Sequence, residues 1–95
     1  MKTYNWNAIK NKTLINERNI SFESVIFHIQ NNGLMDEIKH PNDKNYPNQR
    51  IYIVNIDDYA YLVPYVELDD EVFLKTIIPS RKATKKYLGV KNERD

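Results

Sequence analysis

Two arginines each lie at the start of a predicted strand or helix, and their guanidinium groups are suited to binding phosphate. Arg50 opens a predicted strand, and Arg81 follows Ser80, a residue type that caps helix N-termini. A planar guanidinium matches the oxygens of a phosphate, and the first turn of a helix adds free N–H groups and a positive dipole end. The residues therefore predict phosphate binding at Arg50 and at Arg81.

The charges of the C-terminal half fall into two blocks of one sign. Residues 55–71 contain six acids and no Lys or Arg, whereas residues 75–91 contain six bases and no acid. A block of positive charge is a candidate surface for a polyanion. On the predicted helix after Ser80 this block supplies Arg81, Lys82, Lys85 and Lys86. A solvated helix face explains the same pattern equally well.

Other chemistries find less support. The chain has no cysteine, and its two histidines, His28 and His40, lie outside any metal-ligand spacing, so we expect no metal and no cofactor. Turn formation accounts for the acidic pairs at residues 57–58 and 69–70. Tyrosines at positions 59, 61 and 65 would share one sheet face, where packing against helices is a commoner role than stacking on RNA bases.

The elements that must position these residues follow from periodicity and capping. Asn7 is a plausible cap for a helix to about Arg18, and Ser21 for a second helix with an apolar stripe. The stripe consists of Phe22, Val25, Ile26 and Ile29. Residues 31–33, NNG, supply the left-handed residue that ends this second helix.

Alternation predicts strands at residues 50–56, 59–66 and 72–78, with short strands at 4–6 and 33–39 as further candidates. Pro64 indicates a bulge or an exposed edge in the second of these strands. A short basic helix follows at residues 81–88. We expect one α+β domain over residues 1–95, with helices packed on one face of an antiparallel meander of three to four strands.

Size and hydropathy indicate where the chain works. A domain of 95 residues buries a modest share of its surface, so a stable partner would help it. No segment approaches the roughly 20 apolar residues that span a bilayer, and the N-terminus lacks the apolar run of a signal peptide. We therefore expect a soluble, cytoplasmic protein without a membrane partner.

Several motifs occur in an order that resembles BrnT toxins of the RelE ribonuclease superfamily. The sequence reads YNWN at residues 4–7, has Lys10, and continues with ISFE at 20–23 and Phe27. His40 precedes Arg50, and residues 77–86 read IIPSRKATKK, which is similar to the closing motif of the family. The chain differs from the family at Asn7, where the family has Asp, and at residues 17–19, ERN, where it has Lys-His-Gly.

The resemblance implies a RelE-like fold and a metal-independent endoribonuclease, the toxin of a type II toxin–antitoxin system. It also implies a DNA-binding antitoxin as partner in a hetero-oligomer, with RNA, free or as ribosome-bound mRNA, as substrate. We place Arg50 and Arg81 at the phosphate, and His40 as the first choice for a proton carrier. The candidate RNA-binding residues are Lys82 and Lys85, at flanking phosphates, and Lys86 and Tyr87, which are also second choices for the proton carrier. A non-catalytic RNA- or ribosome-binding module, or a domain that docks an acidic protein, remains the alternative.

Overall fold

The computed structural model describes residues 2–42 and 44–89, which form one mixed sheet and three α-helices. In chain order the elements are β1 (Thr3–Trp6), α1 (Ala8–Arg18), α2 (Phe22–His28), a π-helical turn (Ile29–Gly33), β2 (Leu34–Lys39), β3 (Gln49–Ile56), β4 (Tyr59–Leu68), β5 (Glu71–Leu74), β6 (Ile78–Pro79) and α3 (Arg81–Leu88). The strands are ordered β1-β5-β4-β3-β2, and β6 pairs with β4. The α+β class is therefore confirmed. None of the helices in these ranges is long and apolar enough to cross a membrane.

Side-chain caps start all three helices where the sequence predicts. The Asn7 side chain accepts a hydrogen bond from the Lys10 N–H at 2.9 Å. Ser21 accepts from Ser24 at 3.1 Å. Ser80 accepts from Ala83 at 3.0 Å. Each bond satisfies an N–H that the first helical turn leaves without a partner.

The strands form a mixed sheet, which corrects the expected antiparallel meander. The β2–β3, β3–β4 and β4–β5 pairs are antiparallel, and the acidic pairs make the two tight turns, with Asp57, Asp58 and Asp69 at positive φ. The predicted first strand, however, lies parallel to β5, with Tyr4 opposite Val72. Parallel pairing joins segments far apart in the chain, and no local pattern encodes it.

Pro64 lies at an irregularity of the sheet, as the sequence predicts, but not at an exposed edge. Tyr65 pairs with Leu74 and Leu62 pairs with Ile78, so the segment opposite Pro64 carries one extra residue. Pro64 lies inside β4 and pairs in register with Ile51 of β3. Its carbonyl accepts from the Lys75 N–H at 2.8 Å, so its backbone polar side faces away from β3. The N–H that Pro64 lacks would point to this same side of β4. The pairing of β4 is interrupted there, because β5 ends at Leu74 and β6 begins only at Ile78.

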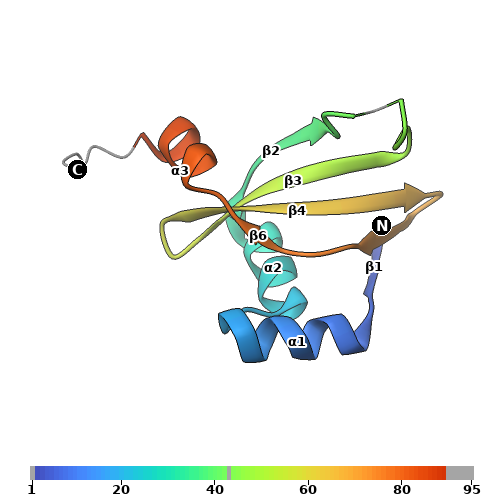
Figure 1. The fold of residues 1–95 in the computed structure, drawn as a ribbon, viewed down its shortest axis with the longest axis horizontal. Coiled ribbons are helices and arrows are strands. Elements are labelled where there is room, and N and C mark those ends of the chain that lie inside the picture. The colour runs from blue at the N-terminus through green and yellow to red at the C-terminus, as the bar shows by residue number, and fades with distance from the viewer. Residues whose placement is uncertain (1, 43, 90–95) are drawn as a thin grey trace.

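The helices cover both faces of the sheet, which corrects the expectation of a single helical layer. Alternate residues of β3, such as Tyr52 and Val54, pack with α1 and α2 in the larger core. The residues between them, Ile51 and Ile53, pack with Ala83 of α3 in a smaller core. Figure 1 shows α1 and α2 on one side of the strands and α3 on the other. Successive residues of β3 therefore face α1 and α2 on one side of the sheet and α3 on the other in turn.

Asn11 joins the two N-terminal helices. Its side-chain oxygen accepts from the Phe22 N–H at 2.8 Å, and its amide donates to the Glu23 carboxylate at 2.8 Å. Asn11 and Phe22 are buried, so the bond between them forms where water does not compete well, whereas Glu23 is exposed. The bond from Asn11 is the largest influence holding the pKa of Glu23 below its ordinary value.

Candidate functional site

Arg50 and Glu37 form an ion pair at the end of the sheet where β3 begins. The Arg50 Nε lies 3.7 Å from the Glu37 carboxylate, and the two side chains are 42% and 35% exposed. The register explains the contact: Lys39 pairs with Arg50, and Glu37 pairs with Tyr52. These residues alternate onto the face that carries α1 and α2. A guanidinium and a carboxylate are thus held together within reach of solvent.

Two buried tyrosines support this pair from within the sheet. The Tyr65 hydroxyl donates to the Glu37 carboxylate. The Tyr65 ring stacks on Tyr52 with centroids 3.9 Å apart and planes 11° from parallel. Burial raises the pKa of Tyr52 above its ordinary value, and Tyr4 and the carboxylates of Glu37 and Glu67 add to the effect. Both rings are closed to solvent, so Tyr65 does not offer a face for base stacking.

An open polar cavity of about 450 Å³ adjoins the ion pair. Its lining brings cationic, amide and carboxylate side chains together: Lys39, Pro47, Asn48, Gln49, Arg50, Glu67 and Asp69. One of these carboxylates has a partner, because the Lys2 Nζ lies 3.2 Å from Glu67. The arrangement suits a small ligand or a polymer segment that carries both an anionic group and hydrogen-bond donors.

His40 lies at the same end of the sheet but not in the cavity lining. Its backbone N–H donates to Gln49 at 3.3 Å, and its ring packs against Tyr46 with centroids 4.5 Å apart. Its Nδ1 accepts from the Asn42 N–H at 3.0 Å. In the neutral ring the proton is therefore on Nε2. His40 could donate a proton only in its charged form, which would break the bond from Asn42.

The basic helix α3 lies elsewhere. Arg81, Lys82, Lys85 and Lys86 are exposed, whereas Ala83 and Thr84 are buried against the sheet. The Thr84 hydroxyl accepts from the Ala60 N–H at 2.9 Å and so fixes α3 beside Ala60.

Arg50 and Arg81 are therefore not brought together. Ala60 pairs with Asn55, which is five residues along β3 from Arg50. This separation is roughly 17 Å at the usual rise per residue. The two arginines also belong to opposite faces of the sheet. The expectation that both contact one phosphate has to be given up.

Tyr87, the aromatic candidate on α3, already has a partner. Its hydroxyl donates to the Asp36 carboxylate at 2.7 Å. This bond is the main cause that lowers the pKa of Asp36 and raises the pKa of Tyr87. Lys86 lies over the Tyr87 ring, 5.3 Å from its centroid. The tyrosine thus ties α3 to β2.

Sequence reasoning missed Glu37, Lys39 and Asp69. Glu37 and Lys39 alternate with Ile38 in the segment that was only a candidate strand, and this alternation was the available signal. Their position beside Arg50 depends on the β2–β3 register, which the nine-residue connection between the strands does not encode locally.

Within the described ranges, no group of three or more His, Cys, Asp or Glu side chains is arranged to hold a metal ion. His28 donates from Nδ1 to the Ser24 carbonyl at 2.7 Å, a contact within its own helix. Comparison with known proteins adds no relative: no family model, no curated protein and no solved structure matches the chain.

Proposed function

We propose that this protein is a metal-independent endoribonuclease that acts as the toxin of a type II toxin–antitoxin pair. The observation that carries the proposal is the 3.7 Å contact between Arg50 and Glu37 beside an open polar cavity. A positioned carboxylate can accept a proton, and a guanidinium can neutralise charge that develops on a phosphate. The BrnT-like order of the sequence motifs supports the toxin role.

The reaction is attack of a ribose 2′-oxygen on the adjacent phosphorus. Glu37 takes the proton of the 2′-hydroxyl as the new P–O bond forms, and Arg50 stabilises the pentavalent intermediate. The bond from phosphorus to the 5′-oxygen then breaks, and this oxygen takes a proton from Lys39 or from charged His40. The products are a 2′,3′-cyclic phosphate and a 5′-hydroxyl, and the step balances without a metal or cofactor as reactant.

Glu37 fits the role of base better than His40. In the neutral state His40 keeps a proton on Nε2, because its Nδ1 accepts from Asn42. In Glu37 the contacts with Tyr65 and Arg50 both fall on Oε2, so Oε1 can take a proton, and the Tyr65 hydroxyl fixes the orientation of the carboxylate. A base held by a buried partner needs little reorganisation when the substrate arrives.

The exposed lysine and arginine side chains of α3 would bind RNA phosphates away from the bond that is cut. Arg81, Lys82, Lys85 and Lys86 present their charges to solvent. Contacts of this kind hold a nucleic acid without reading its sequence, and they weaken steeply as salt is added. Tyr87 would act indirectly, because its hydroxyl is bound to Asp36.

One observation favours a second function. The basic face of α3 lies on the opposite side of the sheet from the cavity, so it can bind a polyanion on its own. The protein would then be a non-catalytic RNA- or ribosome-binding module, or would dock an acidic protein. Binding that falls steeply with salt and is accompanied by no RNA products would favour the RNA-binding module.

The proposed partner is a DNA-binding antitoxin that forms a hetero-oligomer with this protein in the cytoplasm. Large apolar side chains at the solvent surface support a protein partner, because an interface would remove them from water. They include Leu68, Phe73 and Ile78.

The test is RNA cleavage by the purified protein in excess chelator. We expect fragments that end in 2′,3′-cyclic phosphate, and growth arrest when the protein is expressed alone in a bacterium. Glu37→Gln should abolish cleavage while RNA binding persists. Intact RNA after incubation with folded protein, or cleavage that returns only when a divalent ion is added, would contradict the proposal.

A further inference from the structure

The cavity beside Arg50 has walls of opposite charge. Lys39 and Arg50, paired in register, supply the cations from β2 and β3. Glu67 and Asp69 supply carboxylates from the end of β4 and the turn that follows it. A ligand that contacts both walls needs an anionic group at one end and N–H donors at the other.

Of the two carboxylates, Asp69 is the one available to a ligand. The charge of Glu67 is compensated by Lys2 at 3.2 Å. Asp69 is exposed and forms no ion pair with the residues described. It occupies the left-handed position of the β4–β5 turn, with φ of 57°, so the backbone fixes its place at the rim of the cavity.

We propose that this cavity binds the guanine base of the nucleotide whose phosphate lies at Arg50. Guanine is the one common RNA base with two neighbouring N–H donors on its pairing edge, and a carboxylate can accept both. Adenine and cytosine offer one amino group beside an unprotonated ring nitrogen, which a carboxylate repels. Uracil offers one N–H between two carbonyl oxygens. The inference rests on the proposed function and specifies which RNA the protein cuts.

The rest of the lining fits a nucleotide. Pro47 offers an apolar surface to the face of the base, and the side chains of Asn48 and Gln49 can hydrogen-bond to its edge. A volume of about 450 Å³ falls within the range of roughly 300–1,000 Å³ typical of small-ligand sites.

The test measures binding without cleavage. Short oligouridines with 2′-O-methyl groups, which cannot attack their own phosphates, would carry a single G, A or C and be titrated by fluorescence anisotropy. We expect the G-containing strand to bind about tenfold more tightly than the others, the discrimination usual for a two-bond base contact. Asp69→Asn should abolish this preference, because the amide presents a donor where guanine also presents donors.

Asp57→Asn is the matched control. Asp57 also lies in a tight turn between strands with φ of 55°, against 57° for Asp69, but at the other end of β4. Asparagine tolerates the left-handed conformation, so both variants should fold. The control should keep the guanine preference.

Equal affinity for all three strands, or a guanine preference that survives Asp69→Asn, would overturn the proposal. A parallel cleavage assay on unmodified RNA keeps the two ideas separate. Cleavage without base preference would refute the guanine site and leave the ribonuclease function standing. Guanine-selective binding without cleavage would support the site and refute the ribonuclease function.

Discussion

Replacing Arg50 should reduce RNA cleavage far more than replacing Arg81. Arg50 lies 3.7 Å from the carboxylate that we assign as the base, and it lines the cavity. Removing one group that stabilises transition-state charge typically costs about 10²–10³ in rate. We expect a loss of this size for Arg50→Ala. Arg50→Lys keeps the charge without the planar fork and should recover only part of the rate.

The same change should leave folding nearly intact. The Arg50–Glu37 pair is weak as an ion pair, since its two side chains are 42% and 35% exposed. Exposed pairs contribute about 0–1 kcal/mol to stability. The lost activity, about 3–4 kcal/mol in activation free energy, therefore exceeds any folding effect. Urea denaturation of each variant provides the check.

Arg81→Ala is the informative comparison. Arg81 is an exposed residue of α3, on the face of the sheet opposite Arg50. Its loss should weaken RNA binding and reduce the slope of log affinity against log salt by about one, as expected for one phosphate contact. Single-turnover cleavage at saturating protein should stay close to wild type. A slower single-turnover rate for Arg81→Ala than for Arg50→Ala would refute our placement of the site.

Three further predictions concern the scaffold. Asn11→Ala should cost about 1–3 kcal/mol in urea denaturation, because the Phe22 N–H loses its buried acceptor; a wild-type midpoint would contradict this. Gly33→Ala should cost about 1–3 kcal/mol, since an added Cβ would lie 2.6 Å from the His28 carbonyl oxygen; an unchanged melting temperature would show that the backbone yields. Tyr87→Phe should destabilise the protein at neutral pH but not in strong acid: the bond from Tyr87 holds the folded pKa of Asp36 below its ordinary value, so the stabilisation is present above that ordinary value and is lost as pH falls through the folded pKa. An equal loss of stability in acid, measured by thermal melts, would exclude the Asp36 bond as the cause.

Local chemistry made much of the fold predictable. Asn7, Ser21 and Ser80 cap helices because a short side-chain oxygen can reach an N–H three residues ahead, and that relation is visible in the sequence. The acidic turns are local in the same way. By contrast, the β1–β5 pair joins residues such as Tyr4 and Val72, and only the assembled sheet brings them together.

The candidate site was harder to predict because it depends on which face each residue occupies. Alternation puts Arg50 on the face of Tyr52, but it does not say which helix covers that face. The sequence motif around Arg81 indicates a basic helix start, and the structure confirms the helix. Packing of Ala83 against Ile51 and Ile53 then places this helix behind the sheet, away from Arg50.

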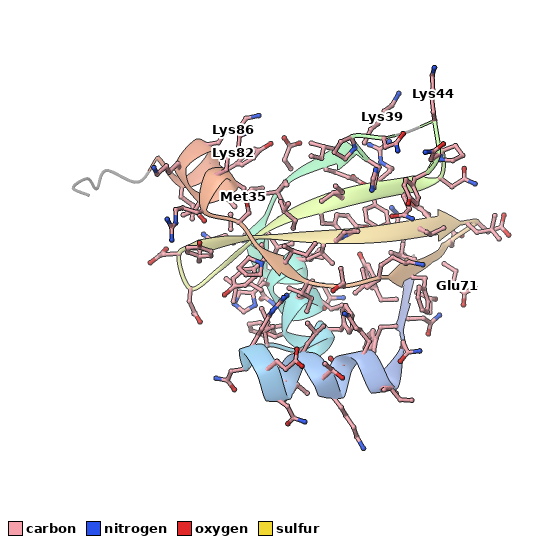
Figure 2. All side chains as sticks on the ribbon, viewed as in Figure 1. Met35, Lys39, Lys44, Glu71, Lys82 and Lys86 are labelled. Atoms are coloured by element: carbon pink, nitrogen blue, oxygen red, sulfur yellow. The ribbon has the colours of Figure 1, made fainter. Side chains whose placement is uncertain are left out.

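An RNA that binds both Arg50 and α3 must therefore pass around an edge of the sheet, and β2 forms the edge beside them. In Figure 2, the side of the molecule where β2 runs carries four labelled lysines. Lys82 and Lys86 lie on α3 at one end of this side, and Lys39 and Lys44 lie at its other end. The six residues of β2 span roughly 20 Å. A strand too short to cover that length can contact only one of the two surfaces. Lys82→Ala together with Lys86→Ala should accordingly weaken binding of long strands and leave the binding of a dinucleotide at the Arg50 cavity unchanged, because only long strands reach α3. An equal loss of affinity for both lengths would show that α3 and the cavity contact the same few nucleotides.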